Sequence, residues 1–104
     1  MLTSSGKFEL SLRGHAGYAP AGSDTVCAAA SMLAYTAARE VLEMERRGKL
    51  REKPHIALDK GHSEIRCEYK ENAMGEAKDL YRIICHGYDL LAANFPENVH
   101  VTTF

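Results

Sequence analysis

The sequence has few of the features that assign a chain to a class at once, beginning with long hydrophobic runs. No apolar run approaches the ~18 residues that a membrane span needs. The N-terminal stretch MLTSSGKFEL lacks the basic-then-apolar order of a secretory signal. We therefore expect a cytoplasmic protein without a membrane partner.

Cysteine is also scarce, and it does not occur in closely spaced pairs. The three cysteines, Cys27, Cys67 and Cys85, are an odd number and form no Cys-x-x-Cys motif. Neither a disulfide framework nor a zinc knuckle is indicated, and free thiols in a reducing compartment fit best. Cys67, in a predicted strand, and Cys85, in the apolar stretch RIICHG, are expected to be packing residues. We predict no metal and no cofactor.

An excess of charge of either sign is absent too. Thirteen basic and fourteen acidic residues give a formal net charge of −1, which supplies no net attraction to a phosphate backbone. The basic run RRGKLREK at 46–53 has glutamates in and beside it, which is typical of a solvated helix end. We expect no nucleic-acid partner. Four histidines without metal-ligand spacing are predicted to be surface residues: His55, His62, His86 and His100.

The first part of the chain predicts a strand, a loop and a helix. Over 7–14, KFELSLRG alternates and places Phe8, Leu10 and Leu12 on one face of a half-buried strand. The next stretch, HAGYAPAGS, contains two glycines and a proline and predicts a loop. A helix should then run from Asp24 to about Arg47, with Gly48 in the left-handed position after it. Its buried face is predicted from the spacing of Val26, Leu33, Ala37, Val41 and Met44.

The second part predicts a hairpin, a helix and a last strand. HIALD at 55–59 and SEIRCEYK at 63–70 flank a turn and should pair antiparallel. A helix over 73–94 should have Asn72 as its N-cap and be ended by Pro96. Its apolar stripe is formed by Leu80, Ile83 or Ile84, Gly87, Leu91 and Phe95. The β-branched residues of NVHVTTF at 98–104 favour a strand that closes the sheet.

These elements predict an α+β fold in a single domain, residues 1–104. A chain of 104 residues is long enough for one compact core and too short for two. The order is roughly β-α-β-β-α-β, which favours a two-layer sandwich with a mixed sheet and both helices on one face.

Cys27 is the residue whose role the helix geometry leaves open. With Asp24 as the N-cap, the thiol would lie in the first turn, where the helix dipole favours a thiolate and the Asp24 carboxylate opposes it. Ser31 follows four residues later, so Asp24, Cys27 and Ser31 share a polar stripe apart from the apolar one. This stripe suggests a site, and the alternative is a buried cysteine that only packs. A nucleophilic thiol needs a base, and His15 stands at the end of the first strand.

The stretch GHAGYAPAGSDTVCAAAS at 14–31 resembles the signature of the ribosomal-processing cysteine proteases known as Prp. That signature has Gly-His-Ala, a glycine-containing loop, and Asp-Ile/Val-Val-Cys-Ala-Ala-x-Ser. The resemblance implies that Cys27 is the nucleophile and His15 the general base, with Gly14, Asp24 and Ser31 at the other motif positions. It also implies removal of the N-terminal extension of bacterial large-subunit ribosomal protein number twenty-seven, by a cut after an aromatic residue. A homodimer is a further expectation.

Two additional expectations accompany the resemblance. The loop at 16–23 would act as a lid, with freedom supplied by Gly17 and Gly22. Backbone N–H groups at the helix start, including that of Cys27, would be candidate oxyanion donors. Two departures from the family are visible. Thr25 replaces an aliphatic residue, and only MLTSS precedes the turn at Gly6, so the family's extra N-terminal strand is short or missing.

Two other classes of function compete with the protease. A ribosome-associated binding module without catalysis would use Cys27 structurally, and its thiol would resist alkylation. A redox sensor would need a resolving cysteine, which the sequence does not identify. The protease is the favoured interpretation.

Overall fold

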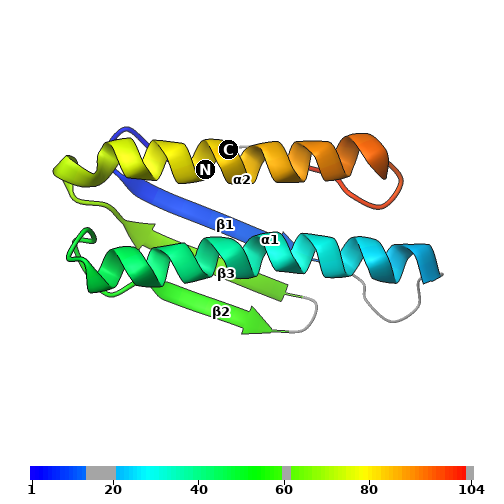
Figure 1. Ribbon diagram of the computed structural model, residues 1–104, viewed down its shortest axis with the longest axis horizontal. Coiled ribbons are helices and arrows are strands. Elements are labelled where there is room, and N and C mark those ends of the chain that lie inside the picture. Colours follow the sequence, from blue (N-terminus) through cyan, green and yellow to red (C-terminus); the bar gives the residue numbers. More distant parts are fainter. Residues whose placement is uncertain (14–20, 60–61, 103–104) are drawn as a thin grey trace.

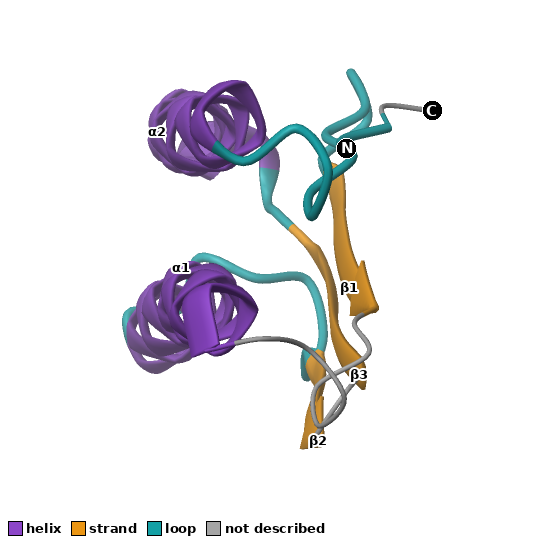
Figure 2. Cartoon of the chain, turned by 90° about the vertical axis from the view of Figure 1, so that its right-hand side faces the viewer, coloured by secondary structure: helices purple, strands orange, loops and turns teal. Residues whose placement is uncertain are grey.

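The computed structural model describes residues 1–13, 21–59 and 62–102, without the side chains of 21–24. Along the chain lie β1 (Lys7–Arg13), α1 (Ala21–Arg46), β2 (His55–Asp59), β3 (His62–Glu68), the short 3-10 helix η1 (Glu71–Ala73) and α2 (Met74–Asn94). The two helices run antiparallel and lie together over the sheet (Figure 1). Both cover the same face (Figure 2), which confirms the α+β class and the two-layer arrangement.

The sheet has the strand order β1-β3-β2, and both pairings are antiparallel. β1 alternates as predicted: Phe8 is buried, Leu10 and Leu12 are half-buried, and the residues between them are exposed. The predicted strand at 55–59 and its pairing with β3 are confirmed. The turn residues 60–61 lie outside the described part of the chain. Because Phe8 and Cys67 are cross-strand partners, as are Leu10 and Ile65, the apolar face of the sheet is continuous under the helices.

The predicted closing strand is wrong within the described residues, where the sheet is purely antiparallel rather than mixed. Residues 99–102 belong to no strand. The N–H groups of Asn98 and Val99 both donate to the carbonyl of Phe95, at 3.0 Å each, which closes a turn after α2. β-branched residues favour a strand only where a neighbouring strand supplies hydrogen bonds and packing.

Residues 1–3 run back along β1 and form a very short extra ladder. Leu2 and Phe8 form an isolated antiparallel bridge, and the N–H of Glu9 donates to the carbonyl of Met1 at 2.8 Å. Gly6 makes the turn at φ +96, and a Cβ there would lie 2.6 Å from the Tyr69 carbonyl oxygen. The turn therefore requires glycine. Residues 1–3 thus form an isolated bridge with β1 and not a strand of the sheet.

Both helices bury one face, with corrections at their ends. The buried face of α1 contains Val26, Ala37, Val41 and Met44 as predicted, and Leu33 packs against the core. α1 ends at Arg46, and Gly48 has φ +73, which confirms its left-handed role.

In α2 the ambiguity between two isoleucines is resolved. Ile84 is buried and Ile83 is 58% exposed. Phe95, at 40% exposure, lies outside the core because the helix ends at Asn94. Asn72 is not the N-cap: it belongs to η1, and Ala73 takes the cap position. A 3-10 turn can precede an α-helix and so move the cap by a residue or more.

The basic run after α1 is paired with acidic side chains. Arg46 contacts Glu43 at 2.7 Å, while Arg47 and Lys49 contact Glu76 of α2 at 2.8 and 3.6 Å. The two pairs with Glu76 join the end of α1 to the start of α2. None of the helices in the described part of the chain has the length and hydrophobicity that a membrane crossing requires.

Candidate active site

The start of α1 lies earlier than the sequence predicts, which changes the position of the Cys27 thiol. α1 begins at Ala21, three residues before the predicted N-cap Asp24, so Cys27 is in the second turn and not in the first. Gly22 is also inside the helix and not in the predicted lid. Gly22 and Ser23 are tolerated in the first turn of α1. The first N–H groups of a helix have no intrahelical acceptor, so this turn depends less on helix propensity than the helix interior does. The side chain of Asp24 lies outside the part of the structure that is described.

The backbone N–H of Cys27 is not a free donor in this arrangement. In an α-helix that begins at Ala21, the N–H of residue 27 points to the carbonyl of residue 23. Within α1 only the N–H groups of 21–23 make no bond of the i to i−4 type. The predicted oxyanion donor at Cys27 is therefore wrong, and the unpaired donors lie one turn earlier.

A cleft with a volume of about 270 Å³ lies where β1 ends beside α1. Cys27 and Ser31 both line it and both are half-buried, as expected for residues four apart on one helix face. The other walls are the end of β1, the β2-β3 hairpin and the segment after α2. They are formed by Leu12, Arg13, Asp59, His62, Ser63, Asn98, Val99 and His100, and α1 adds Val26, Ala30 and Tyr35.

Three of the predicted site residues lie outside the described residues. These are Gly14, His15 and Gly17, together with the other residues of 14–20. Arg13, the last residue of β1, is in the cleft wall, so the chain leaves β1 at the cleft. The described geometry thus brings together Cys27, Ser31 and the residue that precedes Gly14.

A comparison with protein families decides the class. The family model of cysteine protease Prp matches residues 4–100, which is nearly the whole chain. The chain belongs to the cysteine protease Prp family. It is therefore a hydrolase that acts on peptide bonds. Comparisons with curated proteins and with solved structures gave no match.

The three cysteines of this Prp-family protease have different environments. Cys67 is buried in β3, and burial raises the pKa of its thiol to about 11 because the apolar surroundings disfavour the thiolate. It is a packing residue, as predicted. Cys85, on α2, is half-buried and lines a different cavity. Cys27 alone among the three lines the cleft at the end of β1.

Two histidines predicted to be surface residues line the Prp cleft. His62 is the cross-strand partner of Arg13, and His100 comes from the segment after α2. The imidazole Nε2 of His62 is 3.6 Å from Oε2 of Glu64, with which it shares the uncovered face of the sheet. His55 and His86 are exposed and do not line this cleft. The β1-β3 register places His62 opposite Arg13, and no sequence pattern around His62 gives that register.

Tyr88 of α2 connects the second helix to the wall of the Prp cleft. Its hydroxyl donates to the carbonyl of Ala30 at 2.9 Å, in the turn of α1 that follows Cys27. Burial raises the pKa of Tyr88 to about 12, so the hydroxyl stays a donor throughout the neutral range. This contact fixes the distance between the helices beside the cleft.

We expect Tyr88→Phe to lower the free energy of unfolding by about 1 kcal/mol, because one buried hydrogen bond is lost. Tyr69→Phe is the matched control. Among the described residues, the buried Tyr69 hydroxyl has only the thiol of Cys67, a weak hydrogen-bonding group, as a partner. Its removal should therefore leave the stability unchanged or slightly higher. Urea unfolding measures both. Equal losses in the two variants would contradict the role given to the Tyr88 hydrogen bond.

Proposed function

We propose that this protein removes the N-terminal extension of bacterial large-subunit ribosomal protein number twenty-seven, cutting after an aromatic residue. The proposal rests mainly on one observation. In a chain of the cysteine protease Prp family, Cys27 and Ser31 open into a cleft that begins at the last residue of β1.

Cys27 is the proposed nucleophile and His15 the proposed general base. His15 follows Arg13 by two positions, so the covalent chain keeps their Cα atoms within about 7 Å of each other. The imidazole takes the proton from Sγ, and the thiolate forms a bond to the scissile carbonyl carbon. The C–N bond then breaks as the imidazolium returns the proton to the leaving amine. Water hydrolyses the thioester and restores the thiol.

The negative oxygen of the tetrahedral intermediate needs donors, and the start of α1 supplies them. The N–H groups of 21–23 make no bond of the i to i−4 type, and the helix dipole favours an anion there. Gly14, Asp24 and Ser31 occupy the remaining motif positions as supporting residues. Gly17 would give freedom to a lid that is limited to 16–20.

The setting of the reaction is part of the same proposal. Residues 1–104 act as a single protease domain in the cytoplasm, where the precursor is made, and the protein forms a homodimer. The precursor of the ribosomal protein is the partner, as a peptide substrate.

Cleavage of the natural precursor tests the proposal. The purified protein is incubated with the extended ribosomal protein, and the products are identified by mass spectrometry. We expect one cut after the aromatic residue at the end of the extension. A precursor with alanine in place of that aromatic residue is the matched control and should remain intact. An uncut natural precursor would refute the proposed substrate.

A further inference from the structure

The outer edge of β1 carries backbone groups that are directed away from the sheet. Alternate residues of a strand direct their N–H and C=O groups to opposite edges. The N–H of Tyr69 donates to the carbonyl of Gly6, so the even-numbered residues of β1 face β3. On the other edge Glu9 exchanges two hydrogen bonds with Met1, at 2.8 and 2.6 Å. Ser11 and Arg13 are odd-numbered like Glu9, so their backbone N–H and C=O groups also lie on this outer edge.

Ser11 and Arg13 have no backbone partner on this edge among the residues that the structure describes. The ladder formed by residues 1–3 ends at Glu9, and residues 99–102 pass nearby without a hydrogen bond to β1. An unpaired edge is a template for another extended chain. With respect to the described part of the chain, two donors and two acceptors are thus available between Glu9 and the end of the strand.

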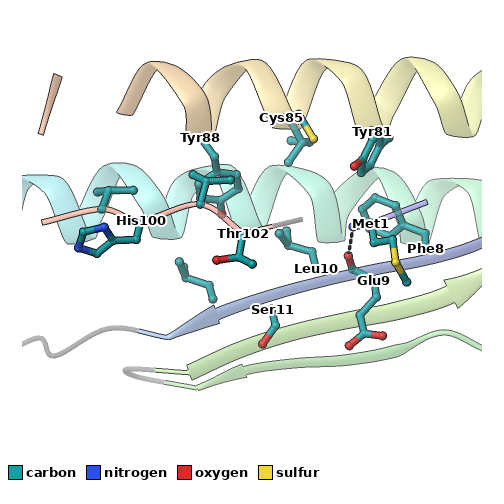
Figure 3. A pocket seen from close by; sticks show the side chains of 14 residues that line it. Met1, Phe8, Glu9, Leu10, Ser11, Tyr81, Cys85, Tyr88, His100 and Thr102 are labelled. Carbon is teal, nitrogen blue, oxygen red and sulfur yellow. Dashed lines mark hydrogen bonds between the residues drawn. The ribbon is translucent and has the colours of Figure 1, made fainter. Parts of the chain in front are cut away.

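A groove follows this edge to Cys27. A cavity of about 130 Å³ lies between β1, α2 and residues 99–102 (Figure 3). Leu10, Ile84 and Tyr88 give it apolar walls. It shares Leu12, Val99 and His100 with the Cys27 cleft, so the two cavities adjoin at the end of β1.

We propose that the peptide substrate binds in this groove as an added strand, hydrogen-bonded to the backbone groups of Ser11 and Arg13. The inference deepens the proposed function and rests on it for the identity of the peptide. Side chains of an extended peptide alternate between faces. Every second side chain therefore enters the apolar cavity beside Leu10 and Tyr88, while the chain leads past Arg13 into the cleft of Cys27. An extended peptide with apolar residues at alternate positions is the ligand class that fits.

Backbone N-methylation of the peptide tests the added strand. A short fluorescent peptide that spans the cut is prepared with one N-methyl group at each position in turn, and its binding to the Cys27→Ala protein is measured by anisotropy. We expect a loss of about tenfold or more at every second position, because only alternate N–H groups face β1. The intervening positions are the built-in control. Losses of affinity that do not alternate between successive positions would overturn the proposal, whether or not the wild type cleaves the peptide.

A pair of variants tests the protein side of the same hydrogen bonds. Ser11→Pro removes the outward N–H and leaves the β1-β3 ladder intact, since proline is tolerated on an edge. Ser11→Ala removes only the side-chain hydroxyl and keeps the backbone N–H. We expect the peptide to bind at least about tenfold more weakly to the Pro variant than to the Ala variant. Equal affinities would overturn the proposal. Light scattering measures the oligomeric state of both variants. A dimer that is lost in Ser11→Pro and kept in Ser11→Ala would also overturn the proposal, because the edge would then pair with a second copy of the chain.

The two proposals fail in different ways. If the wild type cuts the precursor but N-methylation shows no alternation, the added strand is wrong and the protease function stands. If the precursor is not cut but the peptide binds with the expected alternation, the proposed substrate fails and the added strand stands.

Discussion

We expect Cys27→Ala to abolish cleavage of the extended ribosomal protein and to leave the protein folded. The substitution removes the nucleophile, and loss of a nucleophile in a protease lowers kcat by about 10⁴-fold or more. The fold is expected to persist because Cys27 is only half-buried, lines a cleft and lies in a helix that alanine favours. Turnover is followed by mass spectrometry, and circular dichroism monitors the fold. Cys27→Ser should be nearly inactive too, because a hydroxyl is a far weaker acid than a thiol.

Cys67→Ala is the matched control for this prediction. Cys67 is buried in β3 away from the cleft, so its loss should cost some stability and leave turnover near the wild-type rate. Iodoacetamide adds a second readout at neutral pH. Cys27 should react, while the Cys67 thiol is protected by burial and by a pKa raised to about 11. A Cys27→Ala protein that still cleaves would refute the nucleophile. Resistance of Cys27 to alkylation would favour the binding module.

The elements with clear periodicity were predictable from the sequence, and their ends were not. The alternation of Phe8, Leu10 and Leu12 located β1, because one buried face fixes the register of a strand. The start of α1 was missed because Gly22 and Ser23 favour a loop by propensity, yet the first turn of a helix tolerates them. Residues 99–102 show the reverse case, in which β-branched residues form no strand with the described part of the sheet.

One side of the candidate site was predictable and the other was not. Cys27 and Ser31 face the same cleft because residues four apart share a helix face, which any helical interpretation of the sequence gives. His62 and His100 approach the cleft through the β1-β3 register and through the path of the chain after α2. Those are tertiary features, and no local pattern around either histidine encodes them.

His15→Ala should lower turnover strongly without unfolding the protein, because Cys27 would lose the base that takes its proton. General acid-base catalysis contributes about 10² to 10⁴-fold, and a loss in that range is expected. In the wild type, the pH profile of kcat/KM should rise along a limb that reports formation of the reactive thiolate and histidine pair. The limb should be absent or displaced in the variant. Steady-state kinetics across a pH series measures both effects.

The control for His15 has to lie away from the cleft, which excludes His62. His86 is exposed on α2 and lines none of the cavities described above, so His86→Ala should keep the wild-type rate and pH profile. His62→Ala is a second comparison, because His62 lines the cleft although its side chain shares the uncovered face of the sheet with Glu64. If His15→Ala keeps full turnover and His62→Ala loses it together with the ascending limb, the base is His62. If only His15→Ala loses both, His62 forms part of the wall, and the base is the histidine that follows β1.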